Sequence, residues 1–205
     1  MPKGSSELTA ARKEEIIRAC RTLYRTKNFK DITLKDIADA TSFTRTSIYN
    51  YFHTKEEIFL AILEEEYEAW AKELEALKDM KRPSGKKLAE GIARSLEERE
   101  MMLKILSMNH YDMEENSRED NLAEFKVSYK KTMTAMDAVL KTLRISKRNR
   151  EDFLYAFFPF LCGIYPYTCV TEKQREAMET ADAGFVYHSV YELTFSFLKQ
   201  LLEEK

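Results

Sequence analysis

Glycine and proline are scarce in this sequence, with five glycines and four prolines among 205 residues. Both residues are common in turns and unfavourable inside helices, so their scarcity argues against a fold built from hairpins and favours long helices. Apolar runs of about 20 residues, which a membrane-spanning helix needs, are also missing. The first fifteen residues lack the apolar segment of a secretion signal. We therefore expect a cytoplasmic protein with no membrane partner.

Motifs of catalysis and of cofactor binding are missing as well. The sequence has no nucleophile elbow, phosphate-binding loop, His-Glu-x-x-His motif or paired-cysteine motif. Its three cysteines, Cys20, Cys162 and Cys169, lack the spacing of metal ligands and are expected to be small buried hydrophobic residues. The stretch 110–115 holds one histidine and several carboxylates, but it has no partner motif for a metal. The sequence therefore predicts no enzyme, no catalytic residue, no metal site and no cofactor.

The charges are unevenly distributed along the chain, although the net charge is only −2. Residues 1–55 contain eleven Lys and Arg against six Asp and Glu, a balance of +5. Residues 56–205 contain 22 against 29, a balance of −7. A basic N-terminal part on an acidic remainder fits binding to a phosphate backbone at one end only. Solvated charges clustered by chance would look the same, so charge alone does not decide.

Helical spacing of apolar residues predicts an all-α chain without strands or internal repeats. The expected helices cover about residues 9–27, 34–41, 45–51, 55–80, 86–108 as one or two helices, 121–143, 151 onward, 171–180 and 184–202. Pro159 should kink the helix that starts near residue 151, and Pro166 should bend or end it. The polar stretch 109–120 is expected to be a loop.

Capping signals lie close together in the basic part of the chain. Thr33 and Thr44 are expected to cap two short helices, and Thr54 is expected to open a long one. Asp36 and Glu57, each three residues after a capping threonine, complete the signature of a capping box. Two short helices joined by a tight turn, with a helix in front, form a helix-turn-helix, whose second helix presents its N-terminal side chains to base edges in the major groove. Here those side chains are Arg45, Thr46 and Ser47, with Tyr49 and Asn50 one turn further on.

The run from Ile32 to Leu63, ITLKDIADATSFTRTSIYNYFHTKEEIFLAIL, closely resembles the DNA-binding head of the TetR family of transcriptional regulators. The resemblance rests on the Ile37-Ala38 core pair, the Thr44 cap, the segment 48–52 and the helix start 54–57. It covers about residues 9–63, and the remainder resembles the family only in length and helical layout. It implies a regulator, more commonly a repressor, that binds a palindromic operator as a homodimer and is released by a small molecule.

The resemblance also implies roles for individual residues. Thr33, Tyr49 and Lys55 would contact phosphates, which the backbone N–H groups at helix N-termini also favour. Arg45, Thr46, Ser47 and Asn50 would read or approach bases, with Thr44 as the cap of their helix. The sequence departs from the usual family pattern at Ser42, where Gly is common, at Thr46, often Gly, and at Asn50, often His. These departures bear on the operator sequence and on the turn, which must tolerate the Cβ of Ser42.

The expected domains are a helix-turn-helix head of residues 1–54 and a helical body of residues 55–205 that binds a ligand and forms the dimer. Aromatic and Met side chains make adaptable apolar walls, and Tyr hydroxyls and the Trp N–H add polar contacts. They predict a pocket for an apolar or amphipathic effector, lined by Trp70, Met102, Phe125, Tyr129, Met133, Tyr155, Phe158 and Tyr165. At helical spacing, however, aromatic and Met side chains more often form plain core.

The dimer is expected to form through the last helix and the helix after residue 151. The last helix carries two apolar stripes, whereas one stripe is enough to pack a helix onto its own core. Two such helices from each subunit would make a four-helix interface around a twofold axis. The competing explanation is that segment 171–180 folds over the last helix within the same chain. Two other functions stay open: a protein–protein adaptor of the same fold without specific operator binding, and a helical ligand carrier.

Overall fold

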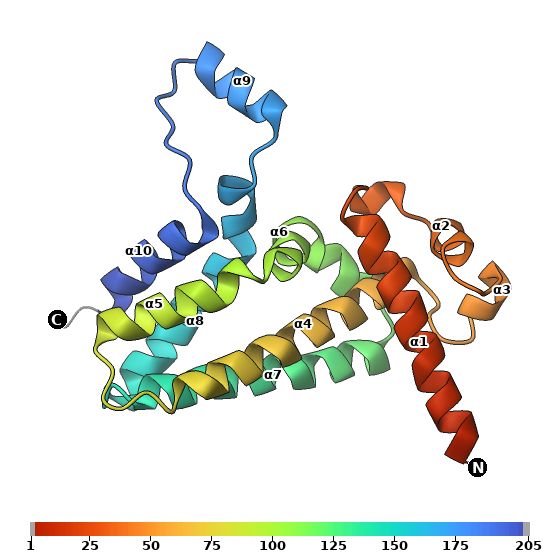
Figure 1. Cartoon of the computed structure of the whole chain (residues 1–205), viewed down its shortest axis with the longest axis horizontal. Coiled ribbons are helices and arrows are strands. Elements are labelled where there is room, and N and C mark those ends of the chain that lie inside the picture. Colours follow the sequence, from red (N-terminus) through yellow and green to blue (C-terminus); the bar gives the residue numbers. More distant parts are fainter. Residues whose placement is uncertain (1–2, 203–205) are drawn as a thin grey trace. The chain divides into compact units, whose positions relative to one another are not determined.

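A computed structural model of the chain describes the backbone of residues 3–202 and the side chains of residues 6–202. Every regular element in this range is helical, so the predicted all-α class is confirmed (Figure 1). The elements are α1 (Lys3–Tyr24), the 3-10 turn η1 (Phe29–Asp31), α2 (Leu34–Asp39), α3 (Arg45–Ile48), α4 (Lys55–Leu77), α5 (Gly85–Glu97), α6 (Glu100–Glu115), α7 (Glu119–Lys141), α8 (Lys147–Thr168), α9 (Glu172–Thr180) and α10 (Val190–Leu202).

The chain forms two compact units. The head unit consists of the residues up to Glu65 together with Asn109–Val127, and the body unit consists of Glu66–Met108 together with the residues from Ser128 on. This division differs from the expected boundary between residues 54 and 55. The reason is that α4 begins at Lys55, but its first turns, with the buried Glu57 and Phe59, belong to the head unit.

The core of the head unit forms between α1, α2 and the start of α4. Ile16, Cys20 and Tyr24 on α1 are buried, as their helical spacing predicts. The Tyr24 ring meets Phe59 of α4 edge to face, with centroids 4.8 Å apart. The Tyr24 hydroxyl donates a hydrogen bond to Asn109 Oδ1 of α6 over 3.0 Å. α1 thereby contacts two of the helices that complete the head unit, α4 and α6.

The three cysteines have two different environments. Cys20 is buried in the head core, and burial raises the pKa of its thiol to about 12, as suits a small hydrophobic residue. Cys162 and Cys169 of the body unit are only half-buried, so the expectation of full burial is wrong for these two.

The expected loop at residues 109–120 is wrong for most of its length, because α6 continues to Glu115 and α7 starts at Glu119. Met113 in this segment is fully buried, while its polar neighbours are exposed or half-exposed. His110 Nε2 and Glu114 Oε1 pair across one helical turn at 2.7 Å. The segment is therefore the end of an amphipathic helix with one buried apolar residue. One apolar position is too few for a helical period to be detected in the sequence.

Both prolines of α8 lie inside the helix, which continues past Pro166 to Thr168. Both are exposed, so water can replace the backbone hydrogen bond that each proline removes. Of the described residues, no single helix is long and apolar enough to cross a membrane, and α8 and α9 meet that measure only as a pair bent by 79°.

α10 begins at Val190, later than the expected start at Gly184. Gly184 has φ +58° and Asp182 has φ +47°, values that no residue inside a right-handed α-helix adopts. Residues 183–189 consequently have no regular structure. Ser189 then caps α10, because its Oγ accepts the Glu192 N–H at 3.1 Å while Glu192 Oε2 accepts the Ser189 N–H at 2.8 Å.

α10 packs within its own chain on α5 and α8. Leu198 is fully buried, and Phe197 stacks on Phe160 with ring centroids 4.2 Å apart. At its end α10 approaches α5 so closely that a Cβ on Gly85 would lie 2.6 Å from the Leu202 carbonyl oxygen. One apolar face of α10 is thus satisfied by the chain itself.

α9 does not cover α10. None of its residues is buried, and Figure 1 shows it at the end of a projection from the body unit, away from α10. The competing explanation for the apolar last helix, in which segment 171–180 folds over it, is therefore not what the structure shows. We call residues 169–189, which include α9 and the two segments that flank it, the arm.

Candidate nucleic-acid interface

The first helix of the motif, α2, is fixed by a complete capping box. Thr33 Oγ1 accepts the Asp36 N–H at 3.2 Å, and Asp36 Oδ2 accepts the Thr33 N–H at 2.9 Å. Hydrogen bonds from Thr33, and then from the Lys27 ammonium at 2.9 Å, hold the pKa of the Asp36 carboxyl well below its usual range. Thr33 is exposed, so a phosphate could reach it as predicted. Its hydroxyl oxygen, however, already accepts the N–H of the capping box.

The turn between α2 and α3 is tied to α1. Glu15 Oε1 accepts the Ser42 N–H at 2.8 Å, and this hydrogen bond lowers the pKa of Glu15. The Phe43 N–H donates to Thr41 Oγ1 at 3.2 Å. Ser42 is not among the described residues with positive φ, which explains how the turn tolerates a Cβ where the family pattern often has Gly.

α3 is a short helix with a buried back and an exposed front. Thr44 caps it by accepting the Ser47 N–H at 3.2 Å. Ile48 is fully buried, and it fixes the helix against the head core. Arg45 and Thr46 at the N-terminal end are exposed, which is the placement that base readout in a major groove requires.

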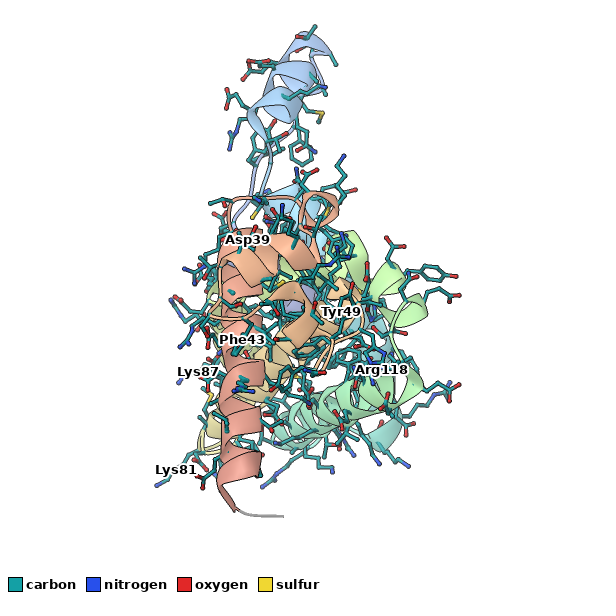
Figure 2. All side chains as sticks on the ribbon, turned by 90° about the vertical axis from the view of Figure 1, so that its right-hand side faces the viewer. Asp39, Phe43, Tyr49, Lys81, Lys87 and Arg118 are labelled. Carbon is teal, nitrogen blue, oxygen red and sulfur yellow. The ribbon has the colours of Figure 1, made fainter. Side chains whose placement is uncertain are left out.

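Arg45 and Tyr49 act as a pair on this front. Arg45 Nη2 donates to the Tyr49 hydroxyl at 3.1 Å, and the guanidinium carbon lies 5.8 Å from the centre of the Tyr49 ring. Tyr49 is 40% exposed, and Figure 2 shows it with Phe43 on the face of the head turned toward the viewer. Asn50 beside them is exposed as well. The tyrosine thus orients the arginine before any DNA is bound.

Lys55 has internal partners. Its Nζ donates to the carbonyl oxygens of Phe29 at 2.7 Å and Ile32 at 3.1 Å, and it lies 4.2 Å from the centre of the Phe29 ring. The side chain is half-buried. These contacts join the start of α4 to η1, so Lys55 has a structural role that the sequence did not indicate, and its phosphate contact stays a prediction.

Two basic residues of α1 border the motif and were not predicted as site residues. Arg12 Nη1 donates to the Tyr51 hydroxyl at 3.3 Å, and its guanidinium carbon lies 5.7 Å from the centre of the Phe43 ring. The Lys13 ammonium lies 6.0 Å from the ring of Phe52. The positive charge of residues 1–55 was the only signal for them, because Arg12 and Lys13 precede their aromatic partners by some thirty to forty residues in the sequence.

The start of α4 is anchored by a buried ion pair. Glu57 is 1% exposed, and its Oε1 lies 2.6 Å from Arg118 Nε and its Oε2 3.1 Å from Arg118 Nη2. Although burial opposes ionisation, the hydrogen bonds of Arg118 keep the pKa of Glu57 below its ordinary value. Thr54 accepts the Glu57 N–H at 3.2 Å as predicted, but Glu57 accepts the N–H of His53, at 2.7 Å, where a capping box would have that of Thr54.

In the body unit three of the predicted ligand residues lie together. Trp70 is fully buried and its ring centre lies 6.1 Å from that of Phe158, which in turn lies 5.3 Å from that of Tyr129. Trp70 Nε1 donates to Ser95 Oγ at 2.9 Å. Met102 is also fully buried, whereas Met133 is half-buried. We call Trp70, Tyr129 and Phe158 the aromatic cluster.

The other predicted ligand residues lie elsewhere. Phe125 belongs to the head unit, where its ring centre lies 6.4 Å from that of His110. Tyr155 is 79% exposed and so does not line an enclosed pocket within this chain. Tyr165 is half-buried beside Cys169, and burial raises the pKa of its phenol to about 12. Ligand binding stays a prediction for all eight residues.

Several polar groups lie near the aromatic cluster without a signal in the sequence. Thr132 is fully buried on α7, and its hydroxyl donates to the Tyr67 carbonyl oxygen of α4 at 2.9 Å. Arg99 pairs with Glu66 at 3.3 Å and also with Glu73. Isolated polar residues in amphipathic helices give no signal in a single sequence, because their burial depends on the partner helix.

Two family models match the chain. Residues 16–62 match a model described as bacterial regulatory proteins of the tetR family, and residues 64–190 match one described as a tetracyclin repressor-like C-terminal domain. A curated relative, the uncharacterized HTH-type transcriptional regulator YfiR of Bacillus subtilis (strain 168), is 36% identical over 63 residues. The matching segment spans 31% of each protein, so less than a third of that relative is covered.

Solved structures resemble the whole chain. A TetR/AcrR-family regulator from Thermobifida fusca has a TM-score of 0.57 at 20% identity, over 94% of this chain and 97% of that one. The transcriptional regulator FadR from Bacillus subtilis, in complex with stearoyl-CoA, has a TM-score of 0.57 at 15% identity, over 93% and 97%. At these identities the likeness shows the fold alone.

Proposed function

The chain belongs to the TetR family of bacterial transcriptional regulators, and we propose that it represses transcription by binding a palindromic operator as a homodimer until a small apolar or amphipathic molecule releases it. The observation that carries the operator part is α3, whose back is fixed by Ile48 and whose front presents Arg45 and Thr46. Arginine forms bidentate hydrogen bonds with guanine. Because Tyr49 already orients Arg45, this side chain loses less conformational entropy when it binds a base.

Selection of bound sequences from a random DNA pool tests this proposal, since operator binding must enrich one palindromic sequence. Arg45→Ala should then weaken operator binding by about 1–3 kcal/mol and relax the base preference at one position of each half-site. Arg25→Ala is the matched control, because Arg25 is also exposed but lies in the turn after α1 and not on α3. Enrichment of no sequence would instead support the adaptor or carrier function.

The aromatic cluster is the region of the body that we propose for the effector. Its aromatic faces suit an apolar group, and the hydrogen bond from the Trp70 N–H to Ser95 Oγ places polar atoms beside them. Stearoyl-CoA, the ligand of the FadR structure, is amphipathic, so acyl-CoA thioesters of several chain lengths belong in a test panel.

Trp70 is the sole tryptophan of the chain and reports on this region directly. An effector at the aromatic cluster should change Trp70 emission over the same concentration range in which it releases operator DNA. Release without any change in Trp70 emission would place the effector elsewhere. Fatty acids and coenzyme A, tested separately, show which half of an active thioester is recognised.

A further inference from the structure

The arm lacks the packing that normally holds a short helix. α9 has nine residues, none of them buried, and it is supported by the Thr171–Gln174 capping box and by the contact of Arg175 with the Tyr187 ring. Isolated helices shorter than about 12–15 residues are marginal in water, because nucleation costs more than a few backbone hydrogen bonds return. The helical state of α9 therefore requires a surface that the single chain does not supply.

Large exposed apolar side chains occur on the arm and along the two helices that flank it. Tyr155 and Tyr167 of α8 are 79% and 58% exposed, Phe185 and Val186 of the arm 38% and 66%, and Leu201 of α10 37%. Single exposed apolar residues are ordinary, but several on neighbouring elements of one unit mark an interaction surface.

A partly open cavity of about 630 Å³ lies between the end of α8 and the arm. Its lining consists of Gly163, Pro166, Tyr167, Val170, Gln174, Ala177, Met178, Phe185 and Tyr187. The Tyr187 hydroxyl is enclosed, and none of the described residues forms a hydrogen bond with it, although Arg175 lies 4.5 Å from the centre of its ring. A buried hydroxyl without a hydrogen-bond partner destabilises the fold. We therefore expect a group from another molecule to form a hydrogen bond with the Tyr187 hydroxyl.

We propose that the arm is an exchange arm that packs against a second copy of this chain, which covers α9 and closes the cavity. The same chain carries both a projecting arm and a partly open apolar cavity, and a twofold axis lets each copy supply what the other lacks. A stable interface uses about 20–30 residues from each side, and the arm, residues 169–189, is itself 21 residues long. This inference rests on the homodimer of the proposed function and specifies what holds it together.

Matched valines test the proposal by sedimentation equilibrium of the full chain. Val186→Glu should raise the dimer dissociation constant about tenfold or more, because it would bury an unpaired carboxylate. Val127→Glu is the control, since Val127 is 68% exposed on α7 of the head unit, and it should leave the constant unchanged. Tyr155→Lys against Tyr111→Lys forms a second pair, each tyrosine being 79% exposed.

Hydrogen exchange of the α9 amides provides an independent measurement. They should be protected above the dissociation constant of the wild-type dimer and exchange freely below it. If the wild-type chain is a dimer, and Val186→Glu and Val127→Glu have the same dimer dissociation constant, the exchange arm is refuted. The proposed function is then unaffected. A wild-type chain that is monomeric at all concentrations would overturn both. If the protection of the α9 amides does not depend on protein concentration, something other than a second copy covers α9 and fills the cavity. The exchange arm is then refuted.

Discussion

Among single residues, Lys55 and Arg45 show how differently two cations of one motif are used. Arg45 is exposed and donates a hydrogen bond to Tyr49, whereas the Lys55 ammonium donates to two backbone carbonyl oxygens. A charged donor to such acceptors stabilises a fold, because removing it costs the Ile32 oxygen this hydrogen bond and leaves the Phe29 oxygen with the Ile32 N–H, 3.2 Å away. The family pattern places both residues at the DNA, and the structure adds a second role for one of them.

Lys55→Met should therefore lower the free energy of unfolding by about 1.5–3 kcal/mol, the range for hydrogen bonds to charged groups. Urea unfolding of the variant measures this, with Lys78→Met as the control because Lys78 is exposed in the turn that follows α4. The salt dependence of DNA binding separates the two roles. Unchanged stability together with a salt slope smaller by about one would show that Lys55 acts on phosphate alone.

The Glu57–Arg118 pair should make stability depend on pH. Because the folded-state pKa of Glu57 lies below its unfolded value, its contribution is present above about pH 5 and is lost as the pH falls through the folded-state pKa. Glu57→Gln should cost about 3 kcal/mol at pH 7, near the lower end for breaking a buried pair, because Arg118 is partly exposed. The cost should shrink at pH 4.

Glu65→Gln is the matched control for this experiment, since Glu65 pairs with Arg21 at 2.7 Å on the surface. Exposed pairs contribute about 0–1 kcal/mol, so this substitution should change stability little at either pH. Equal costs for the two substitutions in urea unfolding would refute a special role for the buried pair.

Among the helices, the packing of α10 on α5 depends on one close approach. A Cβ at Gly85 would meet the backbone oxygen of Leu202 at 2.6 Å, and a backbone atom cannot rotate away. Gly85→Ala should therefore destabilise the fold by about 1–3 kcal/mol, the usual cost of overpacking. Thermal unfolding of the variant measures this.

Gly91→Ala provides the comparison for this contact. Its Cβ would lie 2.9 Å from Leu77 Cδ2, the end of a flexible side chain that can change rotamer. The gain in helix propensity, about 1 kcal/mol, should offset the remaining crowding. If both substitutions lowered the melting temperature equally, the α5–α10 approach would not be the limiting contact.

For the whole molecule, two residues of α7 should separate sensing from DNA binding. Tyr129 belongs to the body unit and the aromatic cluster, whereas Phe125, one turn earlier, is buried in the head unit. Tyr129→Ala should raise the effector concentration that releases operator DNA, with operator affinity within about threefold of wild type. Phe125→Ala should weaken operator binding directly. Gel shifts with and without effector measure both effects. If Tyr129→Ala weakened operator binding and Phe125→Ala changed only the response to effector, these roles of the two residues would be refuted.

The sequence alone determined the class of the fold and the position of the motif. Thr33, Thr44 and Thr54 were identified as helix caps because a cap acts on N–H groups two or three residues away, within reach of a local pattern. The aromatic and capped segment 48–57 then carried the family resemblance, which the family models confirm. Local chemistry and a motif of fixed spacing can be read from one sequence.

The tertiary structure decided what depends on residues far apart in the chain. Glu57 meets Arg118, Tyr24 meets Asn109, and Lys55 meets the carbonyl of Phe29, so none of these partners follows from spacing. The same holds for the end of α6, a polar stretch in which Met113 alone is buried, and for segment 171–180, whose position relative to α10 the sequence left open between two explanations. Burial is a property of two surfaces in contact, and a sequence describes only one of them at a time.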